Sequence, residues 1–402
     1  MKRETIAIHT PYDRPDVYGA LAVPVYNNVS FEFPDAQQMS DAFCNRIKAP
    51  DYARMTNPTV TNFEQRVRAI TGAAHVTAFN SGMAAISNAL ISVAENGKNI
   101  VTTRHLFGNS LSLIANTLLR FGVRSKLRDL TNLEVVEQAV DENTCCIFLE
   151  IVTNPQLEVA DLRALADIAH RRGIPLIADS TVIPFSETRL RDHGVDIEVV
   201  SSTKYLSGGG SSLGGLVIDY GSFPQFNKRL KYEALVNLGA YMTPQVAYIQ
   251  TLGLETLDVR YKRQAQNALW LARELKEEKA IMKVNYVGLP DNPYYDLARR
   301  QFTTSNEAPE QEGGGILAGA MLTIDLISRE ACFNFLNKLK LIHRATNLFD
   351  SRTLAIHPAS TIFGLFPDRQ LQQMDVYQTT IRLSVGLEAP EDLLEDIRQA
   401  LK

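Results

Sequence analysis

Apolar residues between positions 61 and 220 occur in short runs, separated by longer stretches with helical periodicity. The strand-like runs cover residues 75–79, 100–103, 145–150, 176–179, 199–202 and 215–219. The helix-like stretches cover 62–71, a segment that starts near residue 81, 110–121 and 162–172. Strands that alternate with helices are joined by right-handed crossovers into a mainly parallel sheet. The pattern therefore predicts an α/β fold with helices flanking the sheet.

The pattern changes on both sides of this region. Prolines interrupt residues 1–60, so this segment is expected to form an irregular arm that lies on another surface, such as a second subunit. Beyond the last strand-like run, a long helical stretch over 256–279 leads to a strand-rich, helix-flanked portion. We therefore predict an arm over 1–60, a larger α/β domain over 61–250 and a smaller α+β domain over 251–402. The second boundary is placed inside a helix that links the two domains.

Bulk properties exclude several classes of protein. A length of 402 residues, with 45% apolar and 21% charged residues, is ordinary for a globular protein with more than one domain. A formal charge of −4 and the lack of a dense Lys/Arg run argue against nucleic acid as a partner. The apolar stretch at 316–326 is too short to span a bilayer and contains Asp325. No apolar signal segment follows Met1, and the adjacent Cys145 and Cys146 point to opposite faces of a strand, which indicates neither a redox pair nor a metal site. We expect a cytoplasmic protein without a membrane segment or a metal.

Two of the apolar runs end at side chains with clear chemical potential. Lys204 follows the run at 199–202 and precedes the glycines at 208–210, and Asp179 ends the run that begins at residue 174. Ligands of parallel sheets bind beyond the carboxyl ends of the strands, where both residues are expected to lie. An amine that forms a Schiff base and a carboxylate that keeps a pyridine nitrogen protonated are what pyridoxal phosphate (PLP) requires. Taken singly, Lys204 is also compatible with a surface lysine and Asp179 with a turn cap.

Further residues could supply a phosphate site for such a cofactor. Ser81, Gly82 and Met83 begin an alanine-rich helix directly after a strand, and the free N–H groups of a helix start attract anions. The alternative is an ordinary helix with Ser81 as its N-cap. Ser201 and Thr203 would point to the same face of an extended run, so both hydroxyls could reach one phosphate.

Two arginines are candidates for binding anions. Arg54 lies near Tyr52 in the proline-rich arm, where its guanidinium is either solvated or available to a phosphate bound elsewhere. Arg382 lies in a strand-like run at 379–386. A fixed arginine in such a run suits bidentate recognition of an α-carboxylate, and the alternative is an arginine on an edge strand.

Taken together and in this order, these motifs resemble the Cys/Met-metabolism family of PLP enzymes, the cystathionine γ-synthase-like group of fold type I. The resemblance extends from residues 52–59 to residues 382–388 and so covers nearly the whole chain. It implies a fold type I PLP-dependent transferase, with a PLP-binding domain over 61–250 and a smaller α+β C-terminal domain. The segment at 253–257 and Arg260 resemble the helix that links the two domains in this family.

The resemblance also implies roles for individual residues. Lys204 would carry the cofactor covalently and be the catalytic residue, and Asp179 would pair with the pyridine nitrogen. The other implied cofactor contacts are Gly82, Met83, Ser201, Thr203, Phe107, Asn154, Tyr52 and Arg54. Arg382 and Thr353 would bind the substrate. Tyr52 and Arg54 would reach the phosphate in a neighbouring subunit, which implies a homodimer with shared active sites and, in the pattern of this family, a homotetramer.

Within the family, the runs at 353–361 and 150–155 look most like those of the O-acetylhomoserine sulfhydrylases. The implied reaction is a γ-replacement in methionine biosynthesis: O-acetyl-L-homoserine and sulfide give L-homocysteine and acetate. Free sulfide or a sulfur-carrier protein could supply the sulfur. The alternatives are a methionine or cystathionine γ-lyase, an enzyme that uses O-succinylhomoserine, and a catalytically weak PLP-binding protein that acts through interactions.

The chain departs from the family pattern beside the implied cofactor. Phe107 stands where relatives usually have a tyrosine stacked on the ring, Ser180 where they commonly have asparagine, and Gly209 where many have histidine. Stacking needs only an aromatic face, so Phe107 preserves it. The phenol that relatives are thought to use in proton transfer is missing, which argues against a lyase in particular.

Overall fold

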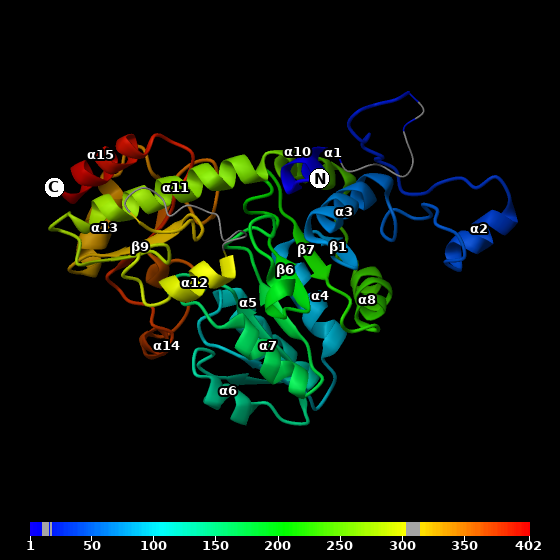
Figure 1. Cartoon of the computed structure of the whole chain (residues 1–402), viewed down its shortest axis with the longest axis horizontal. Helices are drawn as coiled ribbons and strands as arrows, with labels where there is room; N and C mark the ends of the chain where they lie inside the picture. The colour runs from blue at the N-terminus through cyan, green and yellow to red at the C-terminus, as the bar shows by residue number, and fades with distance from the viewer. Residues whose placement is uncertain (10–15, 17, 303–313) are drawn as a thin grey trace.

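The computed structural model describes residues 1–9, 16, 18–302 and 314–402, so residues 10–15 and 17 of the predicted arm lie outside the described residues. Figure 1 shows a larger and a smaller sheet in separate parts of the molecule, with the long helix α11 running along the smaller sheet toward the larger one. The helices are α1 Arg3–His9, α2 Ala36–Phe43, α3 Pro58–Thr71, α4 Gly82–Val93, α5 Gly108–Ser112, α6 Leu133–Ala139, α7 Leu162–Arg171, α8 Phe226–Lys228, α9 Val236–Leu238, α10 Pro244–Glu255, α11 Leu257–Lys276, α12 Tyr295–Phe302, α13 Arg329–Lys338, α14 Asp368–Gln373 and α15 Pro390–Leu401. None of the helices in the described ranges combines the length and apolarity that crossing a bilayer requires.

The larger sheet has the strand order β1-β7-β6-β5-β4-β2-β3. Its strands are β1 His75–Phe79, β2 Asn99–Thr102, β3 Arg124–Leu127, β4 Thr144–Glu150, β5 Leu176–Asp179, β6 Ile197–Val200 and β7 Gly215–Asp219. Every neighbouring pair is parallel except those of β7, which runs antiparallel to both β1 and β6. The prediction of a mainly parallel sheet is confirmed, although the sequence did not indicate β3 or the direction of β7. The chain between β6 and β7 contains no helix, so it returns antiparallel instead of crossing over.

Helices pack on both faces of this sheet, and the alternation of side chains along each strand explains why. Ile147 on β4 packs in one buried cluster with residues of α3 and α7, and the next residue, Phe148, packs in a second cluster with residues of α4. The helix predicted over 110–121 is irregular, because α5 passes into a π-helix over 113–117 and a 3-10 helix over 118–121.

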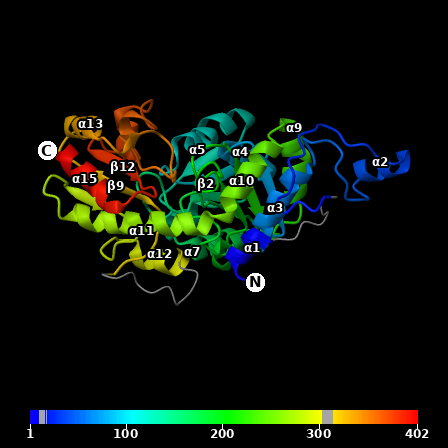
Figure 2. The same ribbon diagram turned by 90° about the horizontal axis from the view of Figure 1, so that it is seen from above.

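The smaller sheet has the strand order β10-β11-β12-β9-β8. Its strands are β8 Lys283–Asn285, β9 Met321–Asp325, β10 His343–Arg344, β11 Leu354–Ile356 and β12 Thr380–Ser384. Only the β10–β11 pair is parallel. Helices α11, α13 and α15 pack around this sheet, as Figure 2 shows from above, which confirms the smaller α+β part of the predicted fold.

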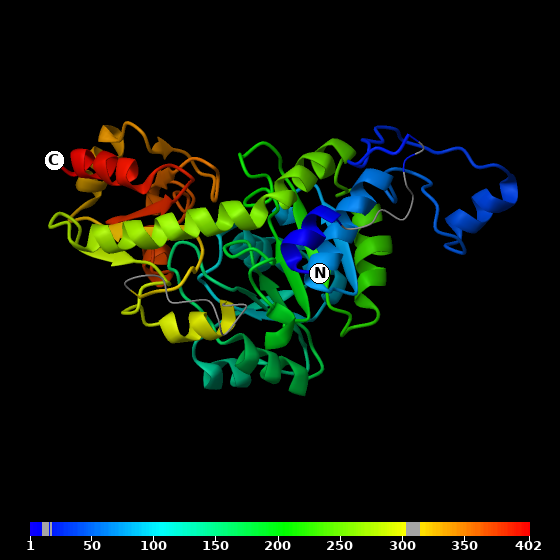
Figure 3. The ribbon, with the colours of Figure 1, turned by 45° about the horizontal axis from the view of Figure 1, so that its top comes forward.

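The helical link between the sheets is attached to the segment that carries Lys204. Helices α10 and α11 meet at Thr256, and residue 250 lies inside α10. Figure 3 shows the two helices following one another from the larger to the smaller part of the molecule. The Arg260 guanidinium donates to the carbonyl oxygens of Tyr205 and Gly253, each at 2.6 Å. A Cβ on Gly253 would lie 1.6 Å from the carbonyl oxygen of Leu206, so only glycine permits this approach.

The segment around α2 extends away from the rest of the chain in Figures 1 and 2. It exposes the apolar side chains of Met39, Phe43 and Ile47. By contrast, α1 packs against α3 and α10 at the other end of the predicted arm.

Candidate active site

Asp179 is the last residue of β5, and Lys204 lies in the turn after the neighbouring parallel strand β6. Lys204 is half-buried in a turn, and its Nζ donates a hydrogen bond to Asn347 Oδ1 at 2.9 Å. Burial, together with the positive charge of Arg382, lowers the pKa of Lys204 to about 8. The neutral, nucleophilic amine is therefore more populated near neutral pH than it is for an exposed lysine.

A second buried carboxyl group faces Asp179. Glu150 ends β4 directly opposite Asp179 on β5, and its Oε1 accepts the backbone N–H of Phe107 at 2.6 Å. Asp179 Oδ1 accepts the backbone N–H of Thr181 at 2.9 Å. Burial raises the pKa of Asp179, and burial together with the charge of Asp179 raises the pKa of Glu150 well above its ordinary value. Because two buried carboxylates repel each other, Glu150 holds its proton more strongly.

Phe107 is thereby fixed at the start of α5, and the same helix contacts the start of α4. The Ser110 hydroxyl of α5 lies 4.0 Å from Met83 Sδ in a weak hydrogen bond. The starts of α5 and α4, which carry Phe107 and Met83, therefore lie close together.

The start of α4 lies against Ser201. A Cβ on Gly82 would lie 2.6 Å from Ser201 Cβ, so only glycine allows the Ser201 side chain to pack this closely against the start of α4. The prediction that Ser201 and Thr203 lie in an extended run is wrong, because β6 ends at Val200 and a turn follows. The Thr203 hydroxyl donates to the carbonyl oxygen of Gly214 and accepts its N–H, so it already holds the turn in place.

Arg382 is fully enclosed between the two sheets. Its Nη1 donates to Asn154 Oδ1 at 3.1 Å and its Nη2 to the carbonyl oxygen of Asn347 at 3.3 Å, while Nε has no hydrogen-bond partner. Within the described ranges, no carboxylate forms an ion pair with this guanidinium. Burial lowers the pKa of Arg382 to about 9, so it remains charged at neutral pH. The edge-strand alternative is wrong, because β12 lies between β11 and β9.

The remaining predicted residues lie elsewhere or have other partners. Arg54 donates to the carbonyl oxygen of Val236 at 2.7 Å, and its guanidinium carbon lies 5.3 Å from the centroid of the half-exposed Tyr52 ring. Thr353 is buried, its hydroxyl donates to Glu388 Oε2 at 2.8 Å, and it accepts the N–H of Gly386. The Thr353 hydroxyl thus has two hydrogen-bond partners within the protein, and its contact with substrate stays a prediction.

Comparison with known proteins identifies the family of this chain. The family model for Cys/Met metabolism PLP-dependent enzymes matches residues 4–402. The chain belongs to this family.

Members of this PLP enzyme family from several bacteria are similar over almost the full length. The O-acetyl-L-homoserine sulfhydrylase of Corynebacterium glutamicum is 31% identical over 98% of this chain and 95% of its own. The L-methionine gamma-lyase of Fusobacterium nucleatum subsp. nucleatum is 35% identical over 99% of this chain and 97% of its own. A crystal structure from Campylobacter jejuni subsp. jejuni, which contains N'-pyridoxyl-lysine-5'-monophosphate, matches with a TM-score of 0.92 and 32% identity, covering 100% of both chains. The fold is therefore fold type I, and the cofactor of this PLP-dependent enzyme is pyridoxal phosphate.

The site residues fit that cofactor. Lys204 has the depressed pKa of an amine that reacts with a carbonyl group, and Asp179 keeps an oxygen that Thr181 does not use. The close approach of Gly82 and Ser201 places the Ser201 hydroxyl beside the start of α4, where backbone N–H groups attract an anion such as a phosphate group.

Sequence reasoning did not identify two residues of the site, Glu150 and Asn347. Glu150 could have been found, because it ends an apolar strand as Asp179 does. Asn347 has no local signal, since it lies in an irregular segment and meets Lys204 across a separation of 143 residues.

Proposed function

We propose that this protein is a transferase that replaces the acetoxy group at Cγ of O-acetyl-L-homoserine with sulfur from sulfide, giving L-homocysteine and acetate in methionine biosynthesis. The observation that carries the proposal is Phe107. Its backbone is fixed by Glu150 beside the candidate cofactor site, and its phenyl ring offers stacking without a phenol for proton transfer. The similarity to the C. glutamicum sulfhydrylase supports the same reaction.

The residues that would hold the cofactor follow from the site. Lys204 would bind it covalently, Asp179 would keep its pyridine nitrogen protonated, and Phe107 would stack on its ring. Further contacts would come from Gly82, Met83, Ser201, Thr203 and Asn154. When bound, PLP supplies a carbonyl carbon for the amine and a ring that accepts electrons from the substrate carbon.

The chain's own residues then account for substrate binding and proton transfer. Arg382 would bind the α-carboxylate, because its guanidinium is buried, charged and unpaired at Nε. Once displaced by the amino group of the substrate, the neutral Lys204 amine would take one proton from Cα and one from Cβ before the acetoxy group leaves. It would return one proton to each carbon after sulfur has added at Cγ. Asn347 would hold this amine in place through Oδ1 while its carbonyl oxygen orients Arg382.

A second subunit would complete the site. Tyr52 and Arg54 lie near one another in the arm, without a contact to Lys204 of their own chain. We propose that they bind the phosphate in a neighbouring copy and that the exposed apolar residues of α2 pack on that copy. The assembly would be a homodimer with shared active sites, and a homotetramer by pairing of dimers.

A γ-lyase is the second candidate, and the 35% identity to the F. nucleatum L-methionine gamma-lyase favours it. The two reactions differ in their products, because elimination releases 2-oxobutyrate and ammonia without sulfide. An O-succinyl ester would give the same homocysteine, with succinate in place of acetate.

The test is an assay of the purified holoenzyme with O-acetyl- and O-succinyl-L-homoserine and with L-methionine, each with and without sulfide, followed by product analysis. We expect homocysteine and acetate only when O-acetyl-L-homoserine and sulfide are both present, and no turnover by Lys204→Ala. Formation of 2-oxobutyrate from L-methionine at a comparable rate would overturn the proposal in favour of the lyase.

A further inference from the structure

A cavity of about 520 Å³ lies on the smaller sheet next to Asn347. Its polar lining consists of Lys340, His343, Arg344, Asn347, Asp350 and Arg352. Three of these side chains carry a permanent positive charge, and only Asp350 is acidic. The cavity therefore favours anions.

Asn347 connects this cavity to the candidate active site. Its Oδ1 accepts from Lys204 Nζ at 2.9 Å, and its carbonyl oxygen accepts from Arg382 Nη2 at 3.3 Å. Its Nδ2 donates to Asp350 Oδ2 at 3.3 Å. One residue thus lines the cavity and contacts both the amine and the guanidinium of the site.

The cationic rim is held in a defined position. Asp396 accepts the backbone N–H groups of Lys340, Leu341 and Ile342, each at 2.9 Å, which fixes the turn before β10. The Arg344 guanidinium donates to the carbonyl oxygen of Leu336 at 2.8 Å. In the described part of the chain, the ammonium group of the exposed Lys340 has no hydrogen-bond or ion-pair partner.

Arg352 closes the other side of the cavity. It forms an ion pair with Asp350 at 2.9 Å and donates to the carbonyl oxygen of Gly209, in the loop after Lys204, at 2.7 Å. Because Arg352 neutralises the single carboxylate, the charges of Lys340 and Arg344 remain uncompensated.

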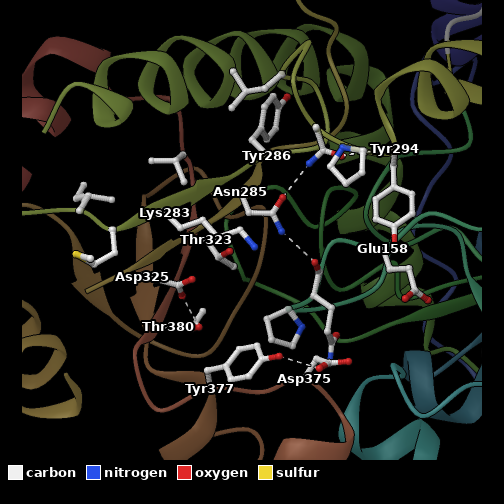
Figure 4. A pocket seen from close by; sticks show the side chains of 18 of the residues that line it. Glu158, Lys283, Asn285, Tyr286, Tyr294, Thr323, Asp325, Asp375, Tyr377 and Thr380 are labelled. Carbon is white, nitrogen blue, oxygen red and sulfur yellow. Dashed lines mark hydrogen bonds between the residues drawn. The ribbon is translucent and has the colours of Figure 1, made fainter. Parts of the chain in front are cut away.

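A larger cavity of about 610 Å³ between the sheets has the opposite character (Figure 4). Its lining contains four carboxylates, those of Glu158, Asp291, Asp325 and Asp375, against the two lysines Lys276 and Lys283 and the imidazole of His105. Acidic side chains thus outnumber the lysines, and neither Lys204 nor Arg382 lines this cavity. An anion would therefore be directed to the basic cavity, whose lining residue Asn347 accepts a hydrogen bond from Lys204.

We propose that the basic cavity binds the sulfur donor in its anionic form, the hydrosulfide ion, before it attacks Cγ. The inference rests on the proposed γ-replacement. The α-carboxylate of the amino acid is assigned to Arg382, so a second anion needs a second cationic surface. Hydrosulfide is abundant in neutral sulfide solutions and is the more nucleophilic species, and Asn347 joins its cavity to the amine that acts on the substrate.

The test compares charge reversals at equal net charge. Lys340→Glu alters an exposed side chain of the cavity, and Lys279→Glu alters an exposed lysine that lines none of the described cavities. We expect Lys340→Glu to raise the KM for sulfide by about three- to tenfold at low ionic strength, as expected for reversing one charge near a monovalent anion. The KM for O-acetyl-L-homoserine and the parameters of Lys279→Glu should stay unchanged. The difference should vanish at about 1 M NaCl, where charges are screened beyond about 3 Å.

Equilibrium dialysis of the same holoenzymes against radiolabelled thiosulfate, without an amino-acid substrate, tests the cavity independently of turnover. Weaker binding by Lys340→Glu than by Lys279→Glu supports the anion site even if the protein proves to be a lyase, whereas equal binding by all variants would overturn it. A dependence on Lys340 of the KM for O-succinyl-L-homoserine, and not of the KM for sulfide, would refute hydrosulfide as the ligand and assign the cavity to the acyl carboxylate.

Discussion

Glu150 lies directly opposite Asp179 where β4 and β5 end side by side. Both carboxyl groups are buried, and no cation in the described ranges forms an ion pair with either of them. Two negative charges on adjacent strand ends repel each other strongly in a low dielectric, so the pair of carboxyl groups keeps one proton. Glu150 keeps the proton and fixes the backbone of Phe107, which leaves Asp179 ionised, as its proposed role beside the pyridine nitrogen requires.

This arrangement predicts different results for Glu150→Gln and Glu150→Ala. Glutamine keeps an acceptor for the Phe107 N–H and should leave the free energy of unfolding within about 1 kcal/mol of the native value. Alanine leaves that N–H without its acceptor and should cost about 1–3 kcal/mol, measured by urea unfolding of the apoprotein. Glu277→Ala, on the surface, is the control. Equal losses in both Glu150 variants would show that the hydrogen bond to Phe107 is unimportant.

The close approach of Gly253 to Leu206 predicts a position-specific effect of a single methyl group. In Gly253→Ala the new Cβ would lie 1.6 Å from a backbone oxygen, so α10 or the segment after Lys204 must shift. We expect a loss of about 1–3 kcal/mol or more in the free energy of unfolding, and reduced PLP affinity, because Lys204 moves with that segment. Gly209→Ala is the matched control, since its Cβ would have no neighbour within 4 Å and its φ is not left-handed. A Gly253→Ala protein as stable as Gly209→Ala would contradict the prediction.

The sequence predicted the part of the site that depends on strand order. Lys204 and Asp179 follow apolar runs, and because parallel strands end at one edge, their proximity follows from the pattern alone. The predicted orientation of the Thr203 side chain was wrong. Strand β6 ends earlier than its apolar pattern, and a turn directs the hydroxyl toward Gly214. The position of Asn347 was not predictable, since only the packing of the smaller sheet against the larger one brings it to Lys204.

Phe107 provides a test of stacking that is separate from catalysis. Phe107→Ala removes the aromatic face and should weaken PLP binding by roughly tenfold, which corresponds to an aromatic contact of about 1.4 kcal/mol. Phe107→Tyr keeps the face and should leave the affinity unchanged, while its new phenol should raise the release of 2-oxobutyrate from O-acetyl-L-homoserine without sulfide. Fluorescence titration of the apoproteins with PLP measures the affinity. Equal PLP affinities of the native protein and both variants would show that Phe107 does not stack on the cofactor.

The positive charge of Arg382 predicts a pH effect at Lys204. Burial is the larger cause of the lowered pKa of Lys204 and Arg382 the second, so Arg382→Met should raise this pKa only part of the way from about 8 toward 10.5. Only the neutral amine attacks a carbonyl, so the rate of PLP uptake by the apoprotein should rise with a midpoint near pH 8, and at higher pH in Arg382→Met.

The lowered pKa of Lys204 also predicts how the stability of the protein depends on pH. Between about pH 8 and 10.5 the folded protein binds fewer protons at Lys204 than the unfolded chain, so this residue makes the free energy of unfolding rise with pH there. Below about pH 8 Lys204 lowers the free energy of unfolding by its full amount. In Arg382→Met, the pH range over which this free energy rises should be narrower, because the folded-state pKa of Lys204 is closer to 10.5. Absorbance-monitored PLP uptake and urea unfolding across this range measure both effects, with Lys279→Met as the control. A midpoint that stays the same or falls in Arg382→Met would show that the guanidinium does not act on the Lys204 amine.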